Sequence, residues 1–238
     1  MSADLFGSFA ESTCAALLMS STTLIATGSG CQFMISNIMY PLMLIALGIF
    51  FCLLVSILST HCMSVKTIDK VELTLKLQLL ISTIILLGVI FGAAFITYPP
   101  NFEVRTKGKI YSELTIVIPY IASICGLVSG LIIAVFTEYV TSHSYGPVKE
   151  LADSCKAGPA SNVTIGLALG YMSTLVPVIM IAATAWVANN FLGYYGVSLA
   201  ALGMLANLPL SLAIDGYGPI SDNAGGIAEM AELGGEVR

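Results

Sequence analysis

The sequence predicts an all-α integral membrane protein with six transmembrane helices. Its composition is 57% hydrophobic and 10% charged, with a mean hydropathy of +0.92, whereas soluble domains carry about 25% charged residues. Six apolar runs are each long enough to cross a bilayer, which takes about 20 helical residues. They cover residues 5–26, 40–58, 77–98, 114–136, 163–188 and 191–213. We therefore expect residues 1–238 to form a single transmembrane region.

Short polar connections separate the six runs. The connection after Pro99-Pro100 is expected to fold locally, and Asn189-Asn190 is expected to form a tight turn between the last two spans. An even number of spans places both termini on one side, and the Lys and Arg count favours the cytoplasm for that side. That side would hold Lys66, Lys70, Lys76, Lys149, Lys156 and Arg238, and the other side Arg105, Lys107 and Lys109.

Glu11 is the one charged residue inside the predicted spans. An acid near the centre of a membrane helix costs about 3 kcal/mol on insertion scales, so it must face protein or water. Asp4 precedes Glu11 by seven residues and would share its helix face about 10 Å away. This spacing favours an ion or proton relay, and the alternative is a structural carboxyl paired with a helix outside this chain.

Asp215 and Asp222 follow the end of the last apolar run and are also seven residues apart. On a continuous helix they would share one face. Gly216, Gly218 and Pro219 lie between them, so a break in the helix is the alternative. The segment Asp-Asn-Ala-Gly-Gly at 222–226 would then let a phosphate or a hydrated metal ion approach the backbone closely.

Small residues and prolines inside the spans predict how the helices pack. Gly126 with Gly130, and Gly166 with Gly170, each place two glycines on one helix face, which allows close helix approach in lipid. Pro209 lies inside the last span, where we expect it to bend the helix.

Five segments together resemble the membrane-bound, ion-pumping inorganic pyrophosphatases, close to the plant-vacuole type. They are Ser-Ala-Asp-Leu-Phe-Gly-Ser-Phe-Ala-Glu-Ser-Thr-Cys-Ala-Ala at 2–16, Thr-Glu-Tyr-Val-Thr-Ser at 137–142, Asp-Ser-Cys-Lys-Ala-Gly at 153–158, Gly-Leu-Ala-Leu-Gly-Tyr at 166–171 and Ala-Ile-Asp-Gly-Tyr-Gly-Pro-Ile-Ser-Asp-Asn-Ala-Gly-Gly-Ile-Ala-Glu-Met at 213–230. The resemblance covers essentially the whole chain, and the last segment is the most specific.

The resemblance implies a hydrolase that is also a translocase: an inorganic diphosphatase that splits magnesium pyrophosphate on the cytosolic side and moves protons or sodium ions across the membrane. Members of that family have about sixteen transmembrane helices in an inner and an outer ring and form homodimers. This chain would be a middle fragment, the sixth through eleventh helices, with its first and last spans in the inner ring. The implied cofactor is Mg²⁺, with K⁺ as an open second cofactor. The implied partners are pyrophosphate, H⁺ or Na⁺ and membrane lipid, with no nucleic acid.

The family motifs assign roles to three residues. Asp222 matches the aspartate that helps to hold the magnesium-pyrophosphate complex, so it is the expected substrate-binding and metal-binding residue. Asp4 and Glu11 match the acids of the ion gate. No catalytic residue is assigned, Glu138 matches a motif acid of unassigned chemistry, and Asp215 is left without a role.

Two other functions stay open at this point. One is an ion-coupled secondary transporter with Glu11 as its proton site, and the other is a non-catalytic membrane scaffold. Because the family's acidic segment before Asp4 and its final helices are missing, we expect this chain alone to be inactive. A eukaryotic source would place the protein in a vacuolar or acidocalcisomal membrane. The choice between H⁺ and Na⁺ and any K⁺ dependence lie outside what these residues decide.

Overall fold

The computed structural model describes residues 2–25, 31–63, 65, 68–106 and 109–235. Helices account for most of this part of the chain, and two strands form an antiparallel hairpin. The elements are α1 (Ser2–Ile25), α2 (Cys31–Cys62), α3 (Ile68–Thr97), β1 (Phe102–Thr106), β2 (Lys109–Leu114), α4 (Val117–Thr141), α5 (Gly146–Ser154), a 3-10 turn η1 (Cys155–Ala157), α6 (Pro159–Ala206) and α7 (Leu208–Met230). The connection just after Thr27 lies outside the described residues, as do Lys66, Lys107 and Arg238 from the charge count.

The prediction of an all-α integral membrane protein is confirmed, with the hairpin as its one small addition in the described part of the chain. Four helical segments there are long and apolar enough to cross a membrane, against the six spans predicted from the sequence. They are Ile35–Cys62, Lys70–Thr97, Val117–Ala157 and Pro159–Ala206. The first and last predicted spans are not among these four. The acids and hydroxyl side chains of α1 lower its hydropathy, and the apolar residues of the last predicted span are divided between α6 and α7.

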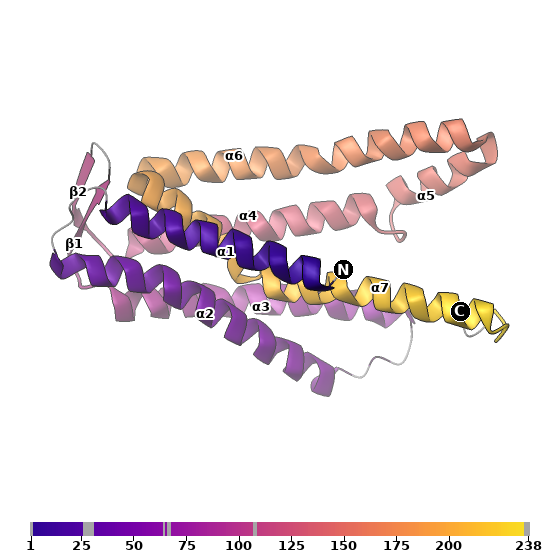
Figure 1. Ribbon diagram of the computed structural model, residues 1–238, viewed down its shortest axis with the longest axis horizontal. Coiled ribbons are helices and arrows are strands. Elements are labelled where there is room, and N and C mark those ends of the chain that lie inside the picture. Colours follow the sequence, from indigo (N-terminus) through magenta and orange to yellow (C-terminus); the bar gives the residue numbers. More distant parts are fainter. Residues whose placement is uncertain (1, 26–30, 64, 66–67, 107–108, 236–238) are drawn as a thin grey trace.

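The loop after Pro99-Pro100 is folded locally, as expected, because its residues pair as the β1-β2 hairpin. The predicted helix from residue 114 starts too early, since Leu114 pairs with Phe102 in this hairpin and α4 begins at Val117. Figure 1 places the hairpin at one end of the bundle and α5 and the start of α3 at the other. The long helices run roughly along the line between these ends.

The chain reverses direction near residues 192–193, where α6 is interrupted. Leu192 and Gly193 have non-helical backbone angles, and Gly193 has φ 60° and ψ −146°. Side-chain-bearing residues avoid that region, so glycine is the residue that permits the turn. The turn predicted at Asn189-Asn190 is therefore misplaced: both asparagines remain helical and the reversal occurs after them.

Residues 193–206, which we call the central segment, form the most enclosed part of the bundle. Most of its residues are buried, namely Tyr195, Gly196, Ser198, Leu199, Ala200, Leu202, Gly203 and Ala206. Glycines let neighbouring backbones approach it closely. A Cβ added to Gly126 of α4 would lie 1.8 Å from the Ala200 carbonyl oxygen, and one added to Gly203 would lie 2.0 Å from that of Ser123.

The two glycine pairs predicted from the sequence differ in how closely other helices pack against them. Gly126 is in close backbone contact, but a Cβ on Gly130 would meet Met204 at an ordinary 3.6 Å. The pair at Gly166 and Gly170 packs loosely: a Cβ would lie 3.6 Å from Leu151 at Gly166 and would meet nothing within 4 Å at Gly170. The close partners of α4 are Ala200 and Gly203 on the central segment.

Aromatic side chains close the hairpin end of the bundle. The Tyr98 and Tyr195 hydroxyl oxygens are 2.7 Å apart, and Tyr195 donates to the Asn37 carbonyl at 2.8 Å. The Tyr98 ring stacks on Phe102 of β1, with ring centroids 4.4 Å apart. Buried tyrosines satisfy their hydroxyls in this way while their rings fill volume. The hairpin is thereby fixed to α2, α3 and the central segment.

The Gly126 contact gives the first prediction. Gly126→Ala should lower the free energy of unfolding by about 1–3 kcal/mol, because the new methyl group overlaps the Ala200 carbonyl. Unfolding of the purified protein in detergent, followed by circular dichroism against added dodecyl sulfate, measures this. Gly130→Ala is the matched control and should be neutral or slightly stabilising, since alanine favours a helix by about 1 kcal/mol over glycine. Equal effects of the two changes would contradict the packing described here.

Candidate functional site

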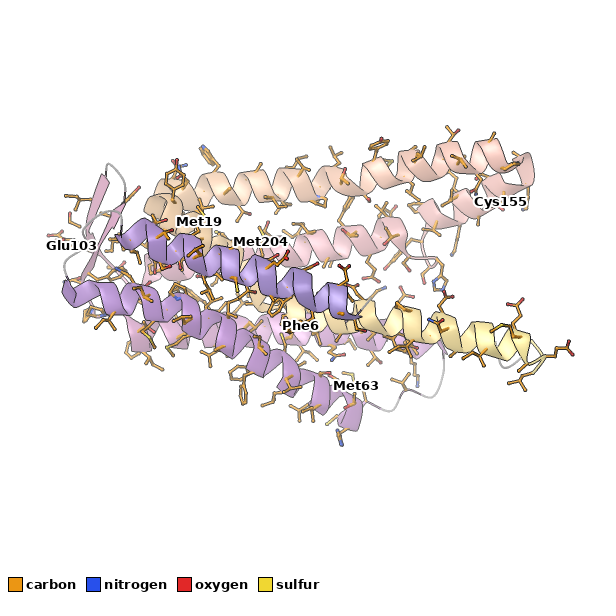
Figure 2. All side chains as sticks on the ribbon, in the orientation of Figure 1. Phe6, Met19, Met63, Glu103, Cys155 and Met204 are labelled. Atoms are coloured by element: carbon orange, nitrogen blue, oxygen red, sulfur yellow. The ribbon has the colours of Figure 1, made fainter. Side chains whose placement is uncertain are left out.

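Asp4 and Glu11 lie on a face of α1 that the described residues leave uncovered. Both are exposed, as is Leu18 one further seven-residue step along the helix. Phe6, labelled in Figure 2 near the N-terminal end of α1, is 71% exposed. The opposite face is buried and carries Ala16 and Leu24. The chain therefore supplies packing for one side of α1, and the two acids lie on the other side.

Asp222 is exposed on α7, which runs without a break from Leu208 to Met230. Of the two alternatives, the structure thus has the continuous helix through Gly216 and Pro219. Pro219 removes one backbone hydrogen bond, that to the Asp215 carbonyl, but the flanking turns continue and Asn223 Nδ2 donates to the Pro219 carbonyl at 2.7 Å. A Cβ on Gly225 or Gly226 would meet nothing within 4 Å, so the backbone after Asp222 is open on that side.

The two helices that carry the predicted site residues pack against each other. The N-terminal end of α1 lies beside the beginning of α7 (Figure 1), and contacts join the two helices. The described residues contain no group of three or more His, Cys, Asp or Glu side chains placed to hold a metal ion. Asp4, Glu11 and Asp222 are thus on neighbouring helices without forming a cluster.

A buried asparagine joins the central segment to α7. Asn207 lies between the two helices, two residues before Pro209, and its backbone N–H bonds the Leu205 carbonyl. Its Oδ1 accepts from Ser82 Oγ at 2.5 Å, and its Nδ2 donates to Thr83 Oγ1 at 2.8 Å. The Cys52 thiol donates to the Ala206 carbonyl at 3.4 Å. The helix is thus interrupted at Asn207, two residues before Pro209, and the Cys52 thiol of α2 bonds a backbone carbonyl at this interruption.

An ionic cluster ties α3 to the end of α4 and the start of α5. Lys76 Nζ lies 2.7 Å from Glu72 Oε1, 2.9 Å from Glu138 Oε1 and 2.8 Å from the Tyr145 hydroxyl. Ser144 Oγ donates to Glu72 Oε2 at 2.5 Å. All three ammonium protons of Lys76 therefore have an acceptor. The motif acid Glu138 has its structural role here, as one partner of this lysine.

Asp215 lines a cavity that reaches this ionic cluster. The cavity, of about 520 Å³, lies between α3, α4 and α7, and Asn207 and Ser211 contribute to its wall. Glu72, Lys76 and Glu138 lie on its other side. Partial burial raises the pKa of the Asp215 carboxyl above its ordinary value. Asp215 and Asp222 are both exposed in the described structure, but Asp215 borders this cavity beside α3 and α4, whereas Asp222 lies further along α7.

Sequence reasoning missed two of these features. Asn207 carried one local signal, Pro209 two residues later, which marks a point where the backbone needs other hydrogen-bond partners. Lys76 was read as a loop charge at the edge of a span. Its pairing with Glu138 joins residues far apart in the sequence, and nothing local indicates it.

The chain matches a known protein family. The model of the family described as inorganic H⁺ pyrophosphatase matches residues 1–238.

Several relatives of the chain are named as ion pumps. A putative K⁺-stimulated pyrophosphate-energized sodium pump of Clostridium tetani is 37% identical over 246 residues, covering 100% of this chain and 32% of the relative. A K⁺-stimulated pyrophosphate-energized sodium pump of Thermotoga maritima is 35% identical and covers 84% of this chain and 27% of its own length. A K⁺-insensitive pyrophosphate-energized proton pump of Methanosarcina mazei is 34% identical over 100% of this chain and 33% of the relative. The chain spans about a third of the length of these relatives.

The Asn207 joint gives the second prediction. Asn207→Ala should destabilise the protein by about 1–3 kcal/mol, because it removes two buried side-chain hydrogen bonds, one from Ser82 and one to Thr83. Thermal unfolding in detergent measures the change. Asn190→Ala, at an exposed position of α6, is the control and should have little effect. Unfolding of both variants at the same temperature would show that the joint does not depend on these hydrogen bonds.

Proposed function

Because the chain belongs to the inorganic H⁺ pyrophosphatase family, we propose that it forms part of a membrane pump that couples pyrophosphate hydrolysis to ion transport. Relatives that align with the whole chain are named as pyrophosphate-energized sodium or proton pumps. Pumping is proposed for the complete protein, since the chain spans about a third of those relatives. The chain by itself is proposed to be inactive.

The packing of α1 against α7 is the observation that supports this function most directly. Asp222, exposed on α7, is proposed to bind the substrate. Asp4 and Glu11, on the uncovered face of α1, are proposed to form the ion gate with helices outside this chain. Direct packing between the two helices would carry a displacement of α7 to α1. Hydrolysis at one helix and ion movement at the other are then coupled by contact.

Mg²⁺ is the proposed cofactor, and Asp222 is the residue of this chain proposed to hold it. An aspartate oxygen suits Mg²⁺, which prefers hard oxygen ligands and usually keeps several waters and substrate oxygens. When bound, Mg²⁺ neutralises pyrophosphate oxygens and so favours attack by water. The open backbone beside Gly225 and Gly226 leaves room for a phosphate at this point of α7.

Further assignments follow from the family. The transported ion is proposed to be H⁺ or Na⁺, with K⁺ as a second cofactor; relatives include both K⁺-stimulated and K⁺-insensitive pumps by name. We propose a homodimer embedded in membrane lipid. In a eukaryotic source the proposed location is the vacuolar or acidocalcisomal membrane.

The Asp222 assignment gives the third prediction. In the complete protein, Asp222→Asn should lower magnesium-dependent phosphate release from pyrophosphate by about 100-fold, because it removes the charge that holds the cation while keeping the side-chain size. Release of phosphate by purified membranes measures this. Asp153→Asn, which alters an exposed acid paired with Lys156, should retain activity. Equal activity of the two variants would refute the assignment, and activity of the 238-residue chain alone would refute its proposed inactivity.

The Glu11 assignment gives the fourth prediction. Glu11→Gln should lower ion transport by roughly tenfold while most hydrolysis remains, because an intramembrane acid acts on the moving ion and not on the phosphate. Acidification of sealed vesicles and phosphate release are measured on the same preparation, with Glu150→Gln on the exposed face of α5 as the control. A parallel loss of both activities would place Glu11 outside the gate. Transport without any phosphate release in the unmodified protein would favour a secondary transporter.

A further inference from the structure

A second cavity opens on the outer side of the ionic cluster, between α3, α4 and α6. Its volume is about 700 Å³, within the range of ligand-binding pockets. Seven of its lining residues are apolar: Leu79, Leu80, Leu131, Ile132, Val135, Phe136 and Val176. Lys76, Glu138, Tyr139 and Tyr145 complete the lining. Two kinds of surface therefore meet in one cavity.

The two kinds of lining residue are separated along the expected membrane normal. Each apolar residue falls inside an apolar run that is long enough to cross a bilayer. Lys76 directly precedes one such run, and Glu138 and Tyr139 lie two and three residues after the end of another. The cavity thus has a polar mouth at the membrane surface and an apolar wall that continues into the hydrocarbon region. A lipid molecule has the same polarity in the same direction.

We propose that this cavity binds one membrane lipid with a cationic amine in its headgroup, of the ethanolamine or choline type. One acyl chain lies along the apolar wall beside Ile132 and Val135. The amine lies at the Glu138 carboxylate and the face of the Tyr139 ring. This site is separate from the acids assigned to substrate and ion, and it holds whether or not the proposed pump activity is correct.

The charge of the mouth selects against an anionic headgroup. Lys76 is the one cation that lines the cavity, and its three protons are engaged by Glu72, Glu138 and Tyr145. It has no donor left for a lipid phosphate. The three charged groups of the cluster, Glu72, Lys76 and Glu138, sum to a net charge of −1. The ammonium group of an ethanolamine or choline lipid is attracted to this charge, and the lipid as a whole is neutral, whereas phosphatidylglycerol brings a net negative charge and no cation.

The aromatic side chains of the mouth favour the same ligand. The Tyr139 and Tyr145 ring centroids lie 5.3 Å apart, and Lys76 Nζ lies 5.0 Å from the Tyr145 centroid. Tyr145 therefore already has a cation at its ring. The Tyr139 ring is 50% exposed and available for a second one. Aromatic faces bind alkylammonium groups well when water is excluded.

A headgroup comparison on the unmodified protein tests the proposal. The complete protein, purified in detergent, is incubated with phosphatidylethanolamine, phosphatidylcholine or phosphatidylglycerol of identical acyl chains, and native mass spectrometry counts the bound lipid. We expect about one amine lipid per chain to be retained, with binding about tenfold tighter than for phosphatidylglycerol. Equal or tighter binding of phosphatidylglycerol would overturn the proposal.

Two matched pairs of variants locate the binding. Val135→Trp fills the cavity and should reduce bound amine lipid by about tenfold. Val117→Trp places the same side chain at a similarly exposed position at the far end of α4 and should leave binding unchanged. Glu138→Gln should abolish the headgroup preference, while Glu150→Gln should keep it. Equal lipid binding by Val135→Trp and Val117→Trp, or an unaltered preference in Glu138→Gln, would show that the lipid binds elsewhere.

Discussion

The close approach of α4 to the central segment is the constraint on which the rest of this bundle depends. The Ala200 and Ser123 carbonyl oxygens lie where side chains of residues 126 and 203 would begin, so both positions need glycine. In lipid there is little hydrophobic force between helices, and small residues in close contact supply the attraction instead. This contact fixes the central segment, which runs from the reversal at Gly193 to the joint at Asn207. The placement of both α6 and α7 follows from it.

Polar groups inside the bundle are concentrated where helical hydrogen bonds are interrupted. At the joint, the Asn207 side chain is hydrogen-bonded to Ser82 and Thr83 of α3. Close to the reversal, the Tyr195 hydroxyl donates to the Asn37 carbonyl of α2. Beyond the joint, the cavity beside Asp215 extends to the pair of Lys76 and Glu138. This pair separates the inner cavity from the apolar one outside. The inner cavity thus joins Asp215 on α7 to the charged groups of α3 and α4.

The sequence predicted the membrane class and the helices because hydrophobicity over 20 residues is a local property. It misplaced features that depend on single backbone angles or distant partners. The reversal needs the φ of Gly193 and does not use the two asparagines before it. Continuity of α7 through Pro219 depends on the turns on either side. For the site, motif resemblance supplied Asp4, Glu11 and Asp222, but their surroundings are not formed by the described residues. The pairing of Lys76 with Glu138 was beyond local reasoning because it is long-range.

The uncovered face of α1 has a consequence for the biogenesis of the protein. A helix that presents Asp4 and Glu11 to hydrocarbon is penalised by about 3 kcal/mol for an acid near its centre. The opposite face of α1 packs against α2, α6 and α7. During synthesis, α1 therefore has a stable place in the membrane only when protein or water meets the face that carries the acids. The acids proposed to gate the ion thus also make stable insertion of α1 depend on what covers this face.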